Sequence, residues 1–345
     1  MKARTSALHS LLLETIEDTM TDLTINSNGS GKVLVGYFAS WSPGAELQLA
    51  NVAAYVNMVI VSFMKPNAAY TKGSYELGKK DELTGLEFNV EGELIKNAIA
   101  LLKQKNPNTK VLISIGGDTY SAFGYFENLN SQAIADVVED FGFDGVDICF
   151  EPYRQAQCST DAQGHIRCTT DELFRTTVSK VRQVLPRPYL LTLSAWSIGA
   201  YGEGQWVNSK PRLGLTGLNL GLLRSSEAQL IDQLNVMSYS AGSEYDPKET
   251  LAAYQHYFRG KITMGVHVPP EPWAPDGVEK YVYTIPKVRE LTQAVQNQNA
   301  AGMMLWYLQA TQDAPSDENP NPEMMAKAIC QLLLLGDCNQ PLFSS

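Results

Sequence analysis

The stretch FDGVDICF (143–150) is one of eight short apolar runs that recur along the chain. The other seven are KVLVGYF (32–38), VNMVIVSF (56–63), KVLISIGG (110–117), YLLTLSAW (189–196), QLNVMSYS (233–240), KITMGVHV (261–268) and GMMLWYL (302–308). Short, continuous apolar runs are typical of strands that are buried on both faces, as they are in parallel sheets. The sequence therefore predicts eight buried parallel strands.

Amphipathic segments with helical spacing lie between these runs. They are ELIKNAIALLKQ (93–104), QAIADVVEDFG (132–142), DELFRTTVSKVRQVL (171–185), IPKVRELTQAVQNQ (285–298) and a closing helix over 324–335. Asn130 and Ser131 are candidate N-caps and Gly142 is a candidate helix end. Strands alternating with helices predict an α/β fold, a single (β/α)8 TIM barrel, with an open doubly wound sheet as the alternative. The short segment between the last two strands leaves no room for an inserted α+β domain there.

The composition limits the kinds of partner. The chain has 345 residues, with Lys plus Arg at 27 against Asp plus Glu at 37, which gives a net charge of −10. This acidic balance argues against nucleic acid or an anionic membrane surface as a partner. No apolar run approaches the roughly 20 residues of a membrane span. We expect an N-terminal extension and linker over 1–31, a barrel over 32–338 and a tail over 339–345.

The five cysteines separate by spacing. Cys158 and Cys168 bracket a polar loop, and Cys330 and Cys338 bracket the end of the last predicted helix. Either pair can close a short loop in an oxidising compartment, or stay reduced, because spacing does not fix connectivity. Cys149 stands alone in an apolar stretch. No Cys-x-x-Cys motif or Cys/His cluster suggests a zinc site.

The chemistry is expected at the end of the FDGVDICF run, which Glu151 follows. Side chains alternate along a strand, so Asp147, Cys149 and Glu151 share one face and are expected to point into the barrel, with Glu151 at its mouth. A buried Asp147 needs hydrogen-bond donors around it. On spacing alone, Asp144 and Asp147 could equally be strand-end polar residues and Glu151 a helix cap.

Four motifs, taken in their order along the chain, resemble those of glycoside hydrolase family 18, the chitinases and chitinase-like proteins. The family's Asp-x-x-Asp-x-Asp-x-Glu reads Asp144, Asp147, Cys149 and Glu151 here; its Ser-x-Gly-Gly reads Ser114-Ile115-Gly116-Gly117; its Met-x-Tyr reads Met237-Ser238-Tyr239; and its last-strand tryptophan is Trp306. The resemblance covers roughly residues 32–335. The motifs fall, in the order of the family, on the third, fourth, sixth and eighth predicted strands, which makes the resemblance specific.

The resemblance implies a substrate-assisted, retaining mechanism, in which the 2-acetamido oxygen of the substrate is the nucleophile. No metal and no cofactor are therefore expected. Glu151 is then the general acid and later the base, and burial must raise its pKa for the acid role near neutral pH. Tyr239 is expected to donate a hydrogen bond to the acetamido oxygen. Asp147 is the third expected catalytic residue, and it could partly substitute for the family's middle aspartate from a deeper position on the strand. Trp306 is expected to form the floor under the sugar, and Asp144 to be structural.

The expected substrate-binding residues are Trp306, Tyr37, Phe63, Gly117, Cys149, Met237 and Trp196, with Trp41 and Trp273 as further aromatic candidates on the active face. Tyr37 and Phe63 are equally compatible with packing at the top of the barrel, and Gln233 with the site or the polar layer of the barrel. Two positions depart from the family pattern: Cys149 replaces its middle aspartate, and Ser240 stands where Asp or Asn is frequent. A thiol is a weak acceptor, and losing one preorganised contact typically costs about 10² to 10³ in rate.

Three functions remain open. The first is a chitinase-type hydrolase of β-1,4-linked N-acetylglucosamine polymers, slowed by Cys149, which the retained Glu151, Tyr239 and Trp306 favour. The second is a weak or inactive protein that binds chitin or its oligosaccharides, which Cys149 and Ser240 favour. The third is an endo-β-N-acetylglucosaminidase. A thiolate nucleophile at Cys149 is disfavoured, because no His or Lys lies nearby in sequence to activate it.

The expected location depends on the same resemblance. A chitin-type substrate and possible disulfides favour a secreted or extracellular protein. The first residues do not resemble a secretory signal, because the apolar patch Leu11-Leu12-Leu13 is short and ends at Glu14. A cytoplasmic location is therefore the alternative.

Overall fold

The computed structural model describes residues 31–79, 81–153, 155–274 and 278–344. The extension predicted over residues 1–31 lies outside the described residues except for Gly31.

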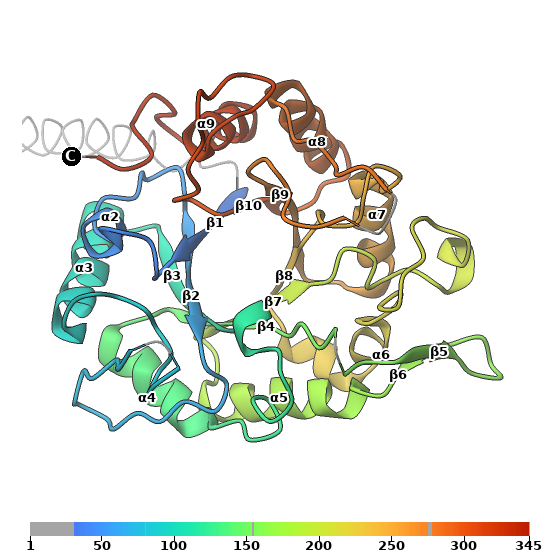
Figure 1. The fold of residues 1–345 in the computed structure, drawn as a ribbon, viewed down its shortest axis with the longest axis horizontal. Coiled ribbons are helices and arrows are strands. Elements are labelled where there is room, and N and C mark those ends of the chain that lie inside the picture. Colours follow the sequence, from blue (N-terminus) through green and yellow to red (C-terminus); the bar gives the residue numbers. More distant parts are fainter. Residues whose placement is uncertain (1–30, 80, 154, 275–277, 345) are drawn as a thin grey trace, which may run out of the picture. The chain divides into compact units, whose positions relative to one another are not determined.

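Eight parallel strands close into a barrel, which Figure 1 shows in a view into its open ring. They are β1 (Val33–Ala39), β2 (Met58–Met64), β3 (Lys110–Gly116), β4 (Gly145–Cys149), β7 (Leu190–Ala195), β8 (Gln233–Val236), β9 (Lys261–His267) and β10 (Gly302–Trp306). The order around the barrel is β1-β10-β9-β8-β7-β4-β3-β2, and β1 pairs with both β2 and β10. Each predicted run therefore contributes one strand, and the open-sheet alternative is wrong.

Helices surround the barrel (Figure 1). They are α2 (Ala45–Leu49), α3 (Gly92–Lys105), α4 (Ser131–Phe141), α5 (Asp171–Val184), α6 (Leu220–Leu223), α7 (Pro247–Tyr257), α8 (Ile285–Asn297) and α9 (Pro322–Leu333). The Asn130 side chain accepts a hydrogen bond from the Ala133 N–H, and Gly142 ends α4 in the left-handed conformation, as the sequence predicted. No helix among the described residues combines the length and apolar character needed to cross a membrane.

A short hairpin between β4 and α5 was not predicted. Its strands β5 (Cys158–Thr160) and β6 (Ile166–Cys168) pair antiparallel and project from the ring of helices (Figure 1). The disulfide Cys158–Cys168 joins them, and a second disulfide joins Cys330 to Cys338 after α9. The structure thereby answers the question of pairing that the spacing left open.

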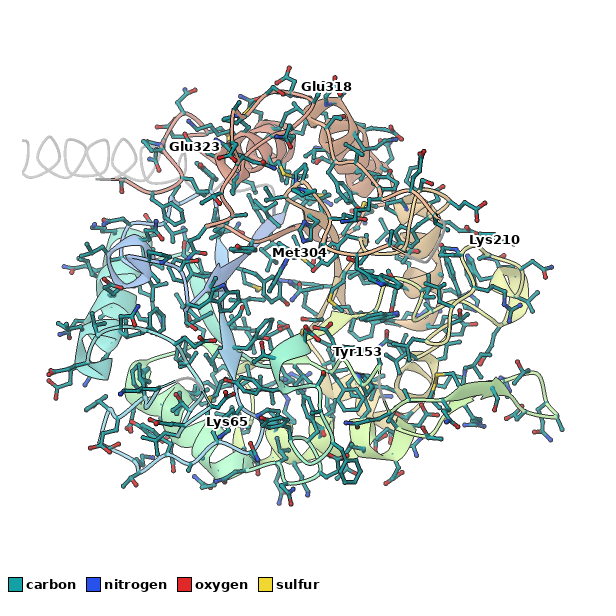
Figure 2. The ribbon with its side chains drawn as sticks, in the orientation of Figure 1. Lys65, Tyr153, Lys210, Met304, Glu318 and Glu323 are labelled. Carbon is teal, nitrogen blue, oxygen red and sulfur yellow. A yellow bond between two sulfur atoms is a disulfide. The ribbon has the colours of Figure 1, made fainter. Side chains whose placement is uncertain are left out.

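The inside of the barrel has an apolar and a polar layer. The apolar layer contains the buried side chains Val35, Met58, Ile60, Leu112 and Met304, and Figure 2 labels Met304 in the middle of the barrel. The polar layer contains Ser114, Asp147, Thr192, Ser194 and Asn235, all buried. Because the apolar layer is packed, the barrel is a solid scaffold for chemistry at the carboxyl ends of its strands.

Candidate active site

Strand β4 positions the three side chains that the FDGVDICF run predicted. It lies between β3 and β7, with Asp147 opposite Ser114 on one side and Thr192 on the other. Asp147 is fully buried, Cys149 is buried above it, and Glu151 is half-buried just beyond the strand end. The alternation of side chains thus gives three depths on one face of one strand.

Asp147 accepts five hydrogen bonds from the surrounding strands. The donors are Tyr37 Oη (2.9 Å), Ser114 Oγ (2.8 Å) and Ser194 Oγ (2.9 Å) to Oδ2, and Thr192 Oγ1 (2.6 Å) and Asn235 Nδ2 (3.4 Å) to Oδ1. These donors offset the cost of burying the carboxylate, which the sequence could only anticipate. Asp147 therefore holds five strands of the barrel together beneath the site.

Glu151 has a different environment. Among the described residues its carboxyl receives one side-chain hydrogen bond, from the thiol of Cys149 to Oε1 at 3.0 Å. Burial raises the pKa of Glu151 from 4.5 to about 7, the negative charge of Asp118 adds to the increase, and the bond from Cys149 opposes it. The carboxyl is therefore substantially protonated near neutral pH and available as a proton donor.

The Cys149 thiol lies between the two carboxyls. Burial raises its pKa well above the ordinary value, and the charges of Glu151 and Asp147 raise it further. The thiol is therefore neutral at pH 7, and it donates to Glu151. A thiolate nucleophile at this position finds no support in these surroundings.

Glu151 and Tyr239 line one cavity of about 580 Å³. Its walls also include the expected residues Trp196, Met237 and Trp273, and Leu213 and Leu215 from the loop after β7. Burial raises the pKa of the Tyr239 hydroxyl well above its ordinary value, so it is neutral. Within the described part of the chain no group hydrogen-bonds this hydroxyl, which leaves it free to donate to a ligand.

The segment that carries Tyr239 leaves the barrel earlier than predicted. Strand β8 ends at Val236, and the next residues turn, with the Ser238 N–H donating to the Val236 carbonyl and the Tyr239 N–H to the Met237 carbonyl, both at 2.8 Å. These are bonds between residues i and i+2, which mark tight turns at strand ends. The turn brings Met237 and Tyr239 together to the cavity wall.

Aromatic rings form a packed floor beside this cavity. Trp306 stacks on Phe63 with centroids 5.6 Å apart, and Phe63 stacks on Trp41 at 6.0 Å. The Tyr37 ring lies 5.3 Å from Trp306. Trp306 and Phe63 also pack with Cys149 in one cluster. Trp306, Tyr37 and Phe63 are not among the residues that line the cavity, so the floor and the cavity are adjoining parts of the mouth.

The Gly116-Gly117 pair lets β3 pass close to the site. Both residues have a positive φ, 100° and 71°. A Cβ on Gly116 would lie 2.3 Å from the Cys149 carbonyl oxygen, and a Cβ on Gly117 would lie 2.7 Å from the Phe63 ring. Because Gly117 has no side chain, its backbone can lie against the Phe63 ring of the aromatic floor.

Asp144 and Gln233 have structural roles, which the sequence analysis gave as one of the possibilities for each. Asp144 accepts the Val111 N–H at 2.9 Å and forms ion pairs with Lys103 and Lys110. Gln233 donates to Asn235 at 2.8 Å in the polar layer. Neither lines the cavity.

Several residues of the mouth were missed at the sequence level. Asp118 and Tyr153 line the cavity, and the Tyr153 hydroxyl donates to Asp118; Figure 2 labels Tyr153 near β4. Asp118 directly follows the Ser-x-Gly-Gly motif, and this position was a usable signal. Leu213 and Leu215 lie in a long loop whose path no sequence pattern indicated.

Glu271, in the proline-rich segment after β9, was also missed. It is 1% exposed, and it accepts hydrogen bonds from the backbone N–H groups of Ser240 (2.9 Å) and Tyr281 (3.2 Å). Burial raises its pKa to about 7, while these N–H groups and Lys280 act to lower it.

Within the described residues, no group of three or more His, Cys, Asp or Glu side chains is placed to hold a metal ion.

Comparisons with known proteins agree with this architecture. A sequence profile described as glycosyl hydrolases family 18 matches residues 33–269. A chitinase of Plasmodium falciparum is 29% identical over 181 residues, covering 51% of this chain and 46% of the relative. The matches span less than half the length of the curated relatives.

Solved structures share the fold. A group IV chitinase of Ostrinia furnacalis superposes with a TM-score of 0.56 at 16% identity, covering 88% of this chain and 100% of that chain. Human YKL-39, described as a pseudo-chitinase with retained chitooligosaccharide binding, superposes with a TM-score of 0.53 at 14% identity, covering 88% of this chain and 99% of that chain. At these identities the likeness concerns the fold alone.

Proposed function

The chain belongs to glycoside hydrolase family 18, and we propose that it hydrolyses β-1,4-linked N-acetylglucosamine polymers with retention of configuration. The observation that carries the proposal is the desolvated carboxyl of Glu151, with its pKa raised to about 7, on the same cavity as the free Tyr239 hydroxyl. A proton donor and a neutral hydrogen-bond donor are the two groups that substrate-assisted cleavage requires from the protein.

In the proposed reaction, Glu151 gives its proton to the glycosidic oxygen as the bond to the anomeric carbon breaks. The acetamido carbonyl oxygen of the same sugar forms a new bond to that carbon, which gives a cyclic oxazolinium ion. Tyr239 donates to the acetamido oxygen and holds it in line for attack. Glu151, now a carboxylate, takes a proton from water, which attacks the anomeric carbon and reopens the ring.

Cys149 is expected to slow this reaction. The oxazolinium carries an N–H and a positive charge. A carboxylate at position 149 would accept a hydrogen bond from this N–H and would offset the charge. The neutral thiol does neither, because it donates to Glu151. Asp147 lies deeper on the strand and has its oxygens occupied by five donors.

The same observation favours a second candidate, a protein that binds chitooligosaccharides with little turnover, as human YKL-39 is described. The aromatic floor of Trp306, Phe63 and Trp41 with Tyr37 beside it, and the cavity walls at Met237 and Trp196, would bind sugar faces in either case. No inserted domain follows β9, which favours an open groove and attack within the polymer. The two disulfides favour an oxidising, extracellular location.

The test is release of product from a chromogenic chito-oligosaccharide, comparing the wild type with Glu151→Gln. If the protein is a hydrolase, the wild type releases product and Glu151→Gln is slower by at least about 10³-fold, because the variant lacks the general acid. Equal absence of product from both proteins at high concentration would reject hydrolysis. Tight binding of the same oligosaccharide without product would establish the binding function instead.

A further inference from the structure

Glu271 is a buried carboxyl that the proposed reaction does not use. It follows the end of β9, which pairs with β8, the strand that leads to Tyr239. Its Oε1 accepts the Ser240 N–H at 2.9 Å and its Oε2 accepts the Tyr281 N–H at 3.2 Å. A carboxyl that is 1% exposed is costly to bury, so a role beyond local packing has to be considered.

The Ser240 N–H belongs to the peptide unit that follows Tyr239. Ser240 has a φ of 54°, in the left-handed region that residues with a side chain adopt rarely. The bond to Glu271 holds this turn and fixes the plane of the peptide unit attached to the Tyr239 Cα. The direction of the Tyr239 Cα–Cβ bond depends on the peptide units on either side of it, so the hydrogen bond from Ser240 to Glu271 restrains where the ring lies.

Two side chains hold the backbone at Tyr239, because the Tyr283 hydroxyl donates to the Ser238 carbonyl on one side and Glu271 accepts the Ser240 N–H on the other. The Tyr239 ring packs edge-on against His267 with centroids 5.4 Å apart, and its hydroxyl has no hydrogen-bond partner among the described residues. The hydroxyl end is therefore held only through the backbone and ring packing. A shift of about 1 Å in such a group can cost on the order of 10² in rate.

We propose that Glu271 is a positioning residue for Tyr239, and that its carboxyl, in the loop after β9, holds the turn after β8 through the Ser240 N–H. The inference rests on the proposed function, since it assigns Glu271 to the step in which Tyr239 orients the acetamido group. Trp273, which lines the same cavity, lies two residues after Glu271. The one carboxylate thus anchors both the Tyr239 turn and the start of the Trp273 wall.

The test is a double-mutant cycle with Glu271→Gln and Tyr239→Phe. Glu271→Gln keeps the shape but places an amide NH₂ against one of the two backbone N–H groups, so one hydrogen bond is lost. We expect kcat on a chito-oligosaccharide to fall about tenfold in the wild-type background. In the Tyr239→Phe background, which has no hydroxyl left to position, the same change should lower kcat less than twofold.

A matched control is Glu279→Gln, which makes the same carboxyl-to-amide change at an exposed residue of the same loop and should leave kcat unchanged. If Glu271→Gln does not fold, Glu271→Asp takes its place, since it keeps the charge and shortens the reach. An equal fall in both Tyr239 backgrounds would mean that Glu271 serves only the fold, and would overturn the inference. So would the absence of any fall.

The two proposals fail in different ways. Absence of turnover by the wild type rejects the hydrolase but leaves Glu271 testable through the Kd for chitotetraose, measured over the same four proteins. Coupling between the two changes in Kd would then support the positioning role, because Tyr239 still has to meet the sugar. Additive effects on Kd would overturn it.

Discussion

Asp147 and Glu151 are two carboxyls on one face of one strand, in opposite surroundings. Asp147 has five donors from five neighbouring side chains, whereas Glu151 has one thiol and an open cavity. The difference shows that depth and donors, and not residue type, decide what each carboxyl can do. The first is an anchor of the barrel, and the second is poised to exchange a proton.

The largest effect on activity is expected at position 149, which lies between the two carboxyls. Cys149→Asp places a third carboxyl between Asp147 and Glu151 and restores an acceptor for the acetamido N–H. We expect kcat to rise by about 10² on a chito-oligosaccharide. Cys149→Ser is the control, because it keeps a neutral donor and should change kcat little. No gain from Asp in a folded variant would mean that the site serves a different purpose.

The anchor role predicts a loss of stability at the deeper carboxyl. Asp147→Asn replaces one acceptor oxygen with an NH₂ group that faces hydroxyl donors. We expect the free energy of unfolding to fall by about 2–3 kcal/mol, because buried donors lose their acceptor. Urea unfolding of the variant and the wild type at pH 7 measures this change. An unchanged midpoint would show that the five hydrogen bonds contribute nothing net.

Replacing the outer carboxyl, Glu151, is expected to raise the free energy of unfolding rather than lower it. The pKa of Glu151 is raised in the folded state, from 4.5 to about 7. Its contribution to stability is therefore complete below about pH 4.5 and is lost as the pH rises through 7. Glu151→Gln does not titrate, so it should gain about 3 kcal/mol relative to the wild type between pH 4 and pH 8, at about 1.36 kcal/mol per pKa unit. A gain that does not vary with pH would contradict this prediction.

The smallest effect is expected at a single donor of the anchor. Tyr37→Phe removes one hydrogen bond to Asp147 and the contact with Ser194 at 2.6 Å. We expect a loss of about 1 kcal/mol in unfolding free energy, because four donors remain. Thermal unfolding detects a change of this size. A loss as large as that of Asp147→Asn would mean that Tyr37 alone holds the carboxylate.

The sequence predicted those parts of the protein that depend on local periodicity. The alternation in FDGVDICF placed Asp147, Cys149 and Glu151 on one face, and the apolar runs identified each barrel strand. The hairpin β5–β6 was missed because each of its strands has three residues, too few for a period to be visible. The pairing of Cys158 with Cys168 depends on that hairpin, and spacing alone could not decide it.

The parts of the site that the sequence missed come from loops. Leu213, Leu215 and Glu271 reach the cavity or its wall through segments whose course is set by tertiary contacts. Glu271 stands in the segment HVPPEPW (267–273), where the sequence drew attention to Trp273 as a possible sugar contact. The bond from Ser240 to its carboxyl joins the loops after β8 and β9, and the bond from Tyr281 closes the loop after β9 on itself. No local pattern indicates such contacts.

The most direct test of the central claim is titration of the Glu151 carboxyl by ¹³C NMR, with the protein labelled at the glutamate side-chain carbons. Glu151→Gln identifies the resonance by its loss, and Glu271→Gln separates the other carboxyl whose pKa is raised to about 7. We expect the Glu151 resonance to titrate near pH 7. Titration near the ordinary value of 4.5 would contradict it, because a carboxyl ionised throughout the neutral range cannot protonate the leaving oxygen.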